Sequence, residues 1–432
     1  MSSRSRKWER WPRSQGCCPV MPSPAPTRSA WGPRLTRPAA EEQPMTEFSD
    51  DSLLMNGTRE QRTLIALSMV DRQVPAAFFD EVFSARLDWP WIVMQAMHQR
   101  VLCYVWENLK HRNLIGPAAR SGLVKNWITY MDQLSQANLE KNTLWLNLLR
   151  RTIEAVNRAG VPIVCIKGSA LIGDIYHPGN RMLGDVDTLI PQSAAAEVSA
   201  VLNELGFVQG TVNFVNNTVE PLSREKIRFW NFNAHIMAKF TLLTNHPSVP
   251  FFRFAAGFDF FDPHDIYSFP SDAVLSRRVP KSVDPIISIP DEADMVLNLC
   301  IHIYREAVSA IFAASADNWH LGKFSDLRIY ILKHDSETLR NAVKSRVAEN
   351  HLEKPYYFAL HYTQAVYGDS ALAPWANLVD PGDDKEFIYE MLDGERRVMY
   401  RAPFSERLFD TAGTEIPGLD PAWKKVMTDD AW

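Results

Sequence analysis

Hydrophobic residues recur every three to four positions in two long stretches of the chain, which predicts helices there. In residues 58–160 this spacing continues to Gly160, where a glycine after Arg158 predicts a helix stop. It returns after Pro290, where Asp291 and Glu292 suit a helix start. The helices predicted there cover residues 294–316, 324–332, 337–348 and 356–367, and roughly the last fifty residues are predicted to be irregular.

Between these stretches the pattern changes to short β-branched and aromatic runs, which is typical of strands. Strands are predicted near residues 161–166, 181–190, 207–214, 238–243 and 254–261, with helices over 170–176 and from Pro191 to Leu205. The predicted fold is therefore an α/β (α+β) core with a small mixed sheet, flanked by an N-terminal and a C-terminal helical region.

The same patterns divide the chain into four parts. The N-terminal helical region is predicted at 45–160, the α/β core at 161–290 and the C-terminal helical region at 291–432. Residues 1–44 are rich in proline, lack apolar periodicity and are predicted to be either a disordered tail or an over-extended start before Met45.

Composition narrows the class of protein. A hydrophobic content of 46% excludes a mainly disordered chain, and a net charge of −5 argues against generic coating of nucleic acid. The five scattered cysteines indicate neither a disulfide framework nor a zinc site, which fits a reducing, cytoplasmic compartment. No membrane span is predicted, because polar residues such as His302 and Arg305 interrupt the most apolar helix.

Two aspartates in a predicted strand are the first candidates for chemistry. Side chains alternate along a strand, so Asp185 and Asp187 are expected to face the same side, with Val186 facing the other. Two close carboxylates repel each other unless they are protonated or bound to a cation. Hard divalent cations such as Mg²⁺ prefer oxygen ligands, so the pair predicts a metal site.

A Gly-Ser pair between a predicted strand and helix strengthens this reading. Unpaired amides at a helix start favour anions, and a glycine allows close approach of a phosphate, so Gly168 and Ser169 are predicted to hold phosphate. Lys167 could neutralise a triphosphate or simply end the strand in water. Arg181, four residues before Asp185, is expected either to contact phosphate or to form an ion pair with Asp174 or Asp185.

These motifs resemble the DNA-polymerase-β-like nucleotidyltransferase superfamily, whose members share Gly-Ser followed by a D-x-D strand. More narrowly, the chain resembles an uncharacterised bacterial nucleotidyltransferase family with helices on both sides of the core, some members of which lie in natural-product gene clusters. The matching residues run from Ile166 to Leu171, then Tyr176, Pro178-Gly179, Arg181, Asp185 to Asp187, and Leu205 to Phe207.

The resemblance implies a third catalytic carboxylate on a later strand. Asp259 is our choice, because it lies in an apolar, strand-like run, and Asp262 and Glu220 are the alternatives. Together with Asp185 and Asp187 it would bind Mg²⁺, or Mn²⁺ in its place, and it would help to deprotonate the acceptor. His302 and Asp326, on predicted C-terminal helices, could shape a pocket for the base or the acceptor, but they are expected mainly to make structural hydrogen bonds.

The expected activity is transfer of a nucleoside monophosphate from an NTP to an unidentified acceptor, with release of pyrophosphate. The acceptor could be a small molecule, a peptide natural product or a macromolecule. Two alternatives stay open at this point. One is a catalytically degenerate nucleotide-binding module that docks proteins, and the other is a toxin-like enzyme that modifies tRNA or protein. The oligomeric state is not predicted.

Overall fold

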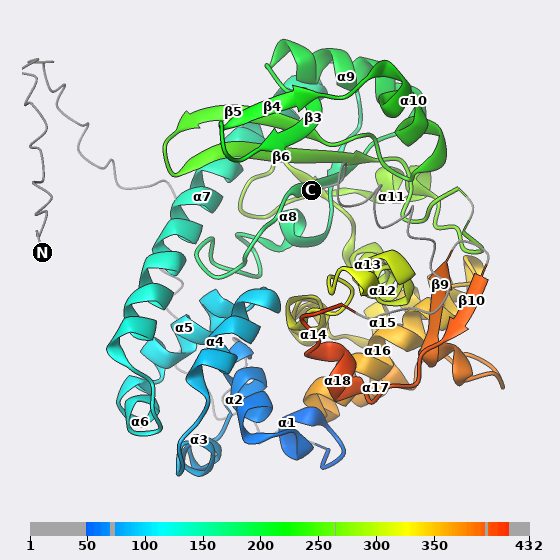
Figure 1. Cartoon of the computed structure of the whole chain (residues 1–432). Coiled ribbons are helices and arrows are strands. Elements are labelled where there is room, and N and C mark those ends of the chain that lie inside the picture. The colour runs from blue at the N-terminus through cyan, green and yellow to red at the C-terminus, as the bar shows by residue number, and fades with distance from the viewer. Residues whose placement is uncertain (1–48, 70–73, 264, 394–395, 414–432) are drawn as a thin grey trace, which may run out of the picture. The chain divides into compact units, whose positions relative to one another are not determined.

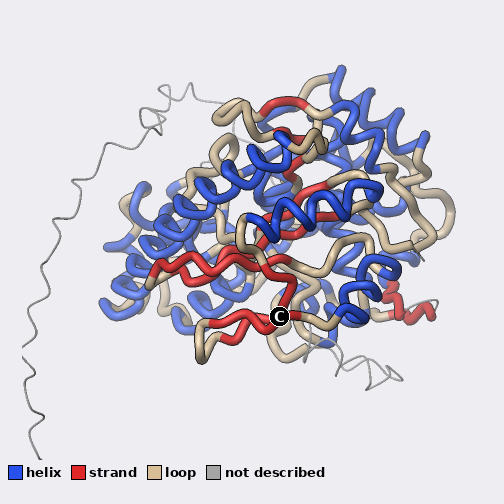
Figure 2. Tube along the Cα trace, turned by 90° about the horizontal axis from the view of Figure 1, so that it is seen from above, coloured by secondary structure: helices blue, strands red, loops and turns tan. Residues whose placement is uncertain are grey.

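The computed structural model describes residues 49–69, 74–263, 265–393 and 396–413, which belong to one unit spanning Thr46–Trp432. The predictions for residues 1–44 lie outside this part of the chain. Helices, drawn in blue in Figure 2, lie on both sides of the strands, drawn in red. Among the described residues, none of the helices combines the length and the apolar character that a membrane span needs.

The helices that precede the sheet pack mainly against one another, and α5 contacts α7, which has 34 residues. Thr58 begins α2 with a capping box, in which its hydroxyl accepts from the Gln61 amide and the Gln61 side chain accepts from the Thr58 amide. These helices are α1 (Leu53–Asn56), α2 (Arg59–Ser68), α3 (Ala76–Val82), α4 (Trp89–His98), α5 (Leu102–His111), α6 (Ile115–Arg120) and α7 (Lys125–Arg158).

A six-stranded mixed sheet forms the core, in the order β1-β2-β6-β5-β3-β4. Strand β2 pairs with β1 in the antiparallel sense and with β6 in the parallel sense, and the other pairs in this sheet are antiparallel. The strands are β1 (Val164–Cys165), β2 (Val186–Leu189), β3 (Val208–Asn213), β4 (Thr218–Pro221), β5 (Phe240–His246) and β6 (Val249–Gly257). This arrangement confirms the predicted fold class.

Shorter elements connect the strands of the sheet and lead from β6 to the C-terminal helices. In Figure 1, α9 and α10 lie above the sheet and α8 lies below it. Helix α8 also contacts β2 and α12, so it links the sheet to the C-terminal helices. The connecting elements are α8 (Lys167–Leu171), α9 (Ala195–Glu204), α10 (Arg224–Asn233), α11 (Ser271–Arg277) and the two-stranded pair of β7 (Val279–Pro280) and β8 (Ser288–Ile289).

The C-terminal helices pack around α12, most of whose residues are buried. A buried ion pair between Arg328 and Asp369, 2.8 Å apart, joins α14 to the segment after α16. The helices are α12 (Glu292–Val308), α13 (Ala310–Ala314), α14 (Leu321–His334), α15 (Glu337–Glu349), α16 (Glu353–Tyr367), α17 (Ala373–Ala376) and α18 (Phe404–Leu408).

The prediction of an irregular C-terminal end is wrong for part of it. A hairpin of β9 (Glu390–Asp393) and β10 (Arg396–Met399) precedes α18, and a bridge from Ser309 to Leu392 ties it to the start of α13. Elements of four or five residues are too short for a hydrophobic period to reveal them.

The predicted strand over residues 181–190 is also too long, because β2 begins only at Val186. The amide of Asn142 on α7 donates to the carbonyls of Pro178 (2.6 Å) and Arg181 (2.7 Å), and Lys141 donates to the carbonyl of Leu183 (2.6 Å). Side chains of a helix therefore satisfy this backbone where a neighbouring strand would otherwise do so.

We predict that Asn142→Ala destabilises the protein by about 1–3 kcal/mol, because it leaves the buried Pro178 carbonyl without this donor. Chemical denaturation measures the change in the free energy of unfolding. Asn147→Ala, an exposed position on the same helix, is the matched control and should change it by less than about 0.5 kcal/mol. Equal effects of the two substitutions would contradict the role of Asn142.

Candidate active site

Strand β2 places two carboxylates side by side. Asp185 lies directly before the strand and Asp187 is its second residue, while Val186 between them is buried. The side chains of Asp185 and Asp187 are 24% and 21% exposed. Both carboxylates are therefore at the partly open face of the sheet, as the strand alternation predicts.

Each carboxylate has its own lysine. The Lys239 ammonium, directly before β5, is 2.7 Å from Asp185, and the Lys167 ammonium, at the start of α8, is 3.2 Å from Asp187. Both lysine side chains are at least two-thirds buried. The two ammonium groups thus offset the repulsion between the carboxylates.

The two aspartates differ in their proton affinity. Burial alone would raise the pKa of Asp185, but Lys239, and behind it Lys167 and Arg253, hold that pKa well below its ordinary value. Burial raises the pKa of Asp187 and the Asp185 carboxylate adds to the rise, against the opposing effect of Lys167. Asp185 is consequently the more firmly ionised member of the pair.

Lys167 has a backbone conformation that non-glycine residues rarely adopt. Its φ is +52°, in the left-handed region, and its amide donates to the side-chain oxygen of Asn298 on α12 at 3.0 Å. Such strain persists where surrounding contacts impose it and is common at functional sites. Helix α12 thus fixes the turn from which the Lys167 ammonium reaches Asp187.

The Gly-Ser pair is buried in this structure. The hydroxyl of Ser169 lies 2.7 Å from the Ile166 carbonyl and 2.8 Å from the Asp187 carbonyl, which ties α8 to β2. A side chain at Gly168 would meet the Leu183 methyl at 2.7 Å, so Leu183 would have to shift to admit one. The phosphate contacts predicted for Gly168 and Ser169 stay predictions.

Arg181 forms its ion pair with a residue of α14. Its guanidinium forms a buried ion pair with Asp326 of α14 at 2.8 Å, and the two side chains are 7% and 2% exposed. Because β2 begins only at Val186, Arg181 does not share a strand face with Asp185. The expected ion pair with Asp174 or Asp185 is therefore wrong in its partner, and contact of Arg181 with phosphate stays a prediction.

A cavity opens between β2, β6 and one face of α12. Asn298, Ile301, His302 and Arg305 line it from α12, at the spacing of a single helix face. From the opposite side it is lined by Lys167, Asp187, His235, Ala255, Gly257 and Asp259. Lys167 and Asp187 therefore belong both to the charged pairs and to the cavity wall.

Two histidines on the cavity wall are held by carboxylates. His235 Nδ1 is 2.6 Å from Asp262, and Arg305 donates to His235 Nε2 at 2.9 Å. His302 Nε2 is 3.0 Å from Glu306, which also pairs with the buried Lys323. Burial lowers the pKa of each histidine to about 4. Both are consequently neutral at pH 7.

Asp259 follows β6 on the same cavity wall. One of its carboxylate oxygens accepts from its own loop, from the Phe260 amide at 2.6 Å and the Phe261 amide at 3.4 Å, and burial raises its pKa. In the described part of the chain, no group of three or more His, Cys, Asp or Glu side chains is placed to hold a metal. Ligation of a metal by Asp259 stays a prediction.

The register of the sheet determines which β6 residues lie beside the carboxylate pair. Asp187 lies opposite Ala255 and Val186 opposite Phe254 of β6, and continuing this register by one residue sets Asp185 beside Arg253. Arg253 also contributes to lowering the pKa of Asp185. The positions of β6 nearest to the pair therefore carry a cation and a methyl group. The alternatives Asp262 and Glu220 bind His235 and Asn213 instead.

The carboxylate pair has a donor set that suits one divalent cation. Asp185 and Asp187 offer adjacent oxygens at a partly open face, and both now have an ammonium group as their counter-ion. Asp185 and Asp187 would hold the metal, which when bound would neutralise charge on phosphate oxygens. Lys167 and Lys239 would then be released toward an anion.

Three residues of this site were missed in the sequence. Lys239 directly precedes β5, Arg253 belongs to β6 and Asn298 to α12, and each reaches the carboxylate pair or Lys167 only through tertiary packing. Lys239 and Arg253 stand as single cations within apolar, strand-like runs, which is a weak signal at best. Nothing in the spacing of Asn298 could have identified it.

Comparison with known proteins gives one match. A family model described as "Uncharacterised nucleotidyltransferase" matches residues 85–368, from the N-terminal helices through the sheet to the end of α16. No curated protein and no solved structure matches the chain.

We predict that the buried, neutral His302 makes the protein less stable in acid. Its pKa is about 4 in the folded state and near 6.5 unfolded, so between these values the unfolded chain binds more protons. Stability therefore falls as the pH drops from about 6.5 to about 4. In His302→Gln the decline should be smaller by on the order of 1–3 kcal/mol, measured by denaturation across this range.

The control for this measurement is His111→Gln, whose side chain is 73% exposed on α5. Its stability should decline with acid as the wild type does. An unchanged decline in His302→Gln would contradict a buried neutral histidine at this position.

Proposed function

The chain belongs to the family of uncharacterised nucleotidyltransferases, and from this we propose that it transfers a nucleoside monophosphate from an NTP to an acceptor hydroxyl. Membership supports nucleotidyl transfer in general. The observation that carries the proposal is the pair of carboxylates at the start of β2, each 3.2 Å or less from a lysine ammonium, with Asp187 and Lys167 on the wall of a cavity. Such a site offers oxygen ligands for a metal and cations for phosphates in one place.

In the proposed reaction the acceptor oxygen forms a bond to the α-phosphorus, and the bond from that phosphorus to the bridging oxygen breaks. Pyrophosphate leaves with the electrons of the broken bond. Asp259, on the wall of the same cavity, is our candidate to accept the proton of the acceptor hydroxyl. Its raised pKa suits a proton acceptor better than an ordinary aspartate.

The cations of this chain would position the triphosphate. Lys167 and Lys239 form ion pairs with Asp187 and Asp185, and Arg253 adds positive charge from β6. These three cations gather around the two carboxylates, and positive charge gathered in this way favours binding of a polyanion. Asn298 holds the Lys167 amide and would keep its ammonium directed toward the phosphates.

One observation favours a second candidate, a nucleotide-binding module without turnover. The β6 positions beside the pair carry Arg253 and Ala255 where a third carboxylate could complete a metal cluster. An NTP that binds to the wild-type protein with Mg²⁺ but is not consumed would favour this candidate. The assay should offer water, simple alcohols and peptide hydroxyls as acceptors.

We predict that Asp187→Asn abolishes Mg²⁺-dependent turnover of labelled NTP, because it removes one of the two carboxylates that would hold the metal. Release of labelled pyrophosphate is the measurement, and circular dichroism checks the fold. Asp272→Asn, at an exposed position of α11, is the matched control and should retain full turnover. Turnover by a folded Asp187→Asn protein equal to wild type would refute the assignment.

We predict that Lys167→Gly lowers turnover of NTP but leaves stability nearly unchanged. Glycine relieves the left-handed backbone, which offsets the lost ion pair, so the free energy of unfolding should change by less than about 1 kcal/mol. Turnover of NTP should fall at least about tenfold, the effect of one lost charge-assisted contact.

His351→Gly is the matched control for this change. His351 also has a left-handed backbone (φ +54°), but it is exposed and distant from Lys167 in the sequence. It should leave turnover unchanged. Full turnover in Lys167→Gly would exclude Lys167 from the phosphate site.

A further inference from the structure

We propose that a second cavity, in the C-terminal region, binds a small aromatic molecule that carries a phosphate or carboxylate group. The cavity lies between α16, the turn at Glu386–Tyr389 and the segment from Arg401 to Arg407, which covers most of α18. It shares no lining residue with the cavity beside Asp187. The proposal does not depend on nucleotidyl transfer.

The centre of this cavity is a buried arginine. Arg407 is 6% exposed, and its Nη2 donates to the Tyr362 hydroxyl at 2.7 Å, which in turn donates to the Ile388 carbonyl at 2.6 Å. Its Nε is buried without a hydrogen-bond partner. Within the part of the chain that the structure describes, no carboxylate forms an ion pair with it.

Two other buried arginines show what Arg407 lacks. Arg181 pairs with Asp326 and Arg328 with Asp369, each at 2.8 Å. Arg328 also has an aromatic ring 5.0 Å from its guanidinium carbon, so an aromatic neighbour in this protein does not replace the carboxylate. A buried charge is costly unless it is paired, and Arg407 lines a cavity that an anion could enter.

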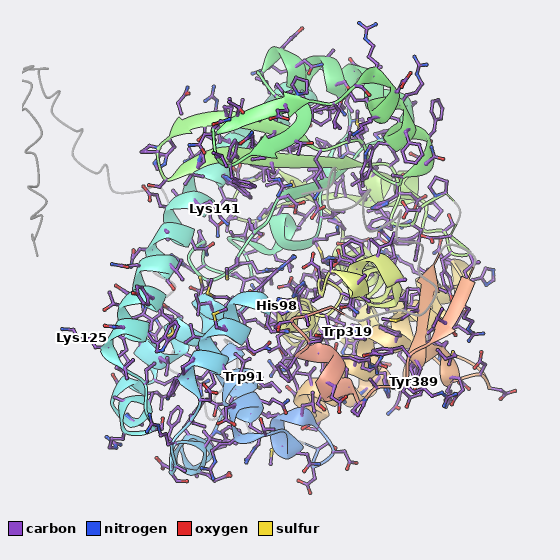
Figure 3. The ribbon with its side chains drawn as sticks, viewed as in Figure 1. Trp91, His98, Lys125, Lys141, Trp319 and Tyr389 are labelled. Atoms are coloured by element: carbon purple, nitrogen blue, oxygen red, sulfur yellow. The ribbon has the colours of Figure 1, made fainter. Side chains whose placement is uncertain are left out.

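Aromatic rings surround the guanidinium on several sides. The ring centres of Tyr362, Trp319, Tyr389 and Phe404 lie 5.1 to 5.8 Å from its central carbon, and Figure 3 labels Trp319 and Tyr389. These rings stabilise the cation but offer its N–H groups no strong acceptor. The planar fork of N–H donors suits two oxygens of a phosphate or carboxylate.

The remaining walls specify the rest of the ligand. Tyr389 and Phe404 line the cavity, and Arg401, 62% exposed, lies over the Tyr389 ring while it pairs with Glu386. A planar ring suits these aromatic walls, and the two arginines suit an anion. The chemical class that fits is an aromatic ring bearing an oxyanion.

The experiment is a calorimetric titration of the full chain with phenyl phosphate. We expect binding of one molecule, with weaker binding of phenol, which lacks the anion, and of inorganic phosphate, which lacks the ring. Benzoate is the carboxylate arm, and the tighter of benzoate and phenyl phosphate identifies the oxyanion. Arg407→Met should weaken binding at least about tenfold.

Two further variants keep the test decisive. Lys167→Gly, in the other cavity, should bind phenyl phosphate as the wild type does. If Arg407→Met does not fold, Ala365→Leu narrows the cavity while it keeps the arginine, and it should weaken binding similarly. Three results would overturn the proposal: no binding to wild type, unchanged affinity in folded Arg407→Met, or loss of binding only in Lys167→Gly.

Discussion

The backbone between Pro178 and Leu183 has no strand to pair with, and the position of the site depends on how α7 supplies the missing donors. Asn138, Lys141 and Asn142, on one face of that helix, donate to four carbonyls of this segment. The segment leads directly into β2. A buried carbonyl without a donor costs more free energy than an ordinary hydrogen bond contributes. The hydrogen bonds from α7 therefore fix the position of this segment, and with it the position of Asp185.

Electrostatics then decide what the site can bind. Two carboxylates on neighbouring positions of one strand face would repel each other, and lysines from two other segments offset that repulsion. Helix α12 contributes to the site in two ways. It holds the Lys167 backbone through Asn298, and it lines the cavity with His302 and Arg305. The sheet and the C-terminal helices are thus joined at the site itself.

Much of this architecture could be predicted from local patterns, since hydrophobic spacing indicates helices and short β-branched runs indicate strands. The shared face of Asp185 and Asp187 follows from strand alternation alone. The partners of Arg181 and Asp185 could not be predicted, because Asp326 and Lys239 are 145 and 54 residues away in sequence. The position of Arg181 depends on where β2 begins. That boundary is fixed by side chains of α7, which no local sequence pattern reveals.

The pairing of each aspartate with a lysine has a consequence for selectivity. A ligand that carries only positive or only negative charge can replace one member of each aspartate–lysine pair. It leaves the other member with an unmatched charge at a largely buried position. A ligand that carries both signs, as a magnesium–nucleotide complex does, would exchange partners with all four groups at once. Free nucleotide and free metal ion would then each be poor ligands alone, and their binding would be mutually dependent.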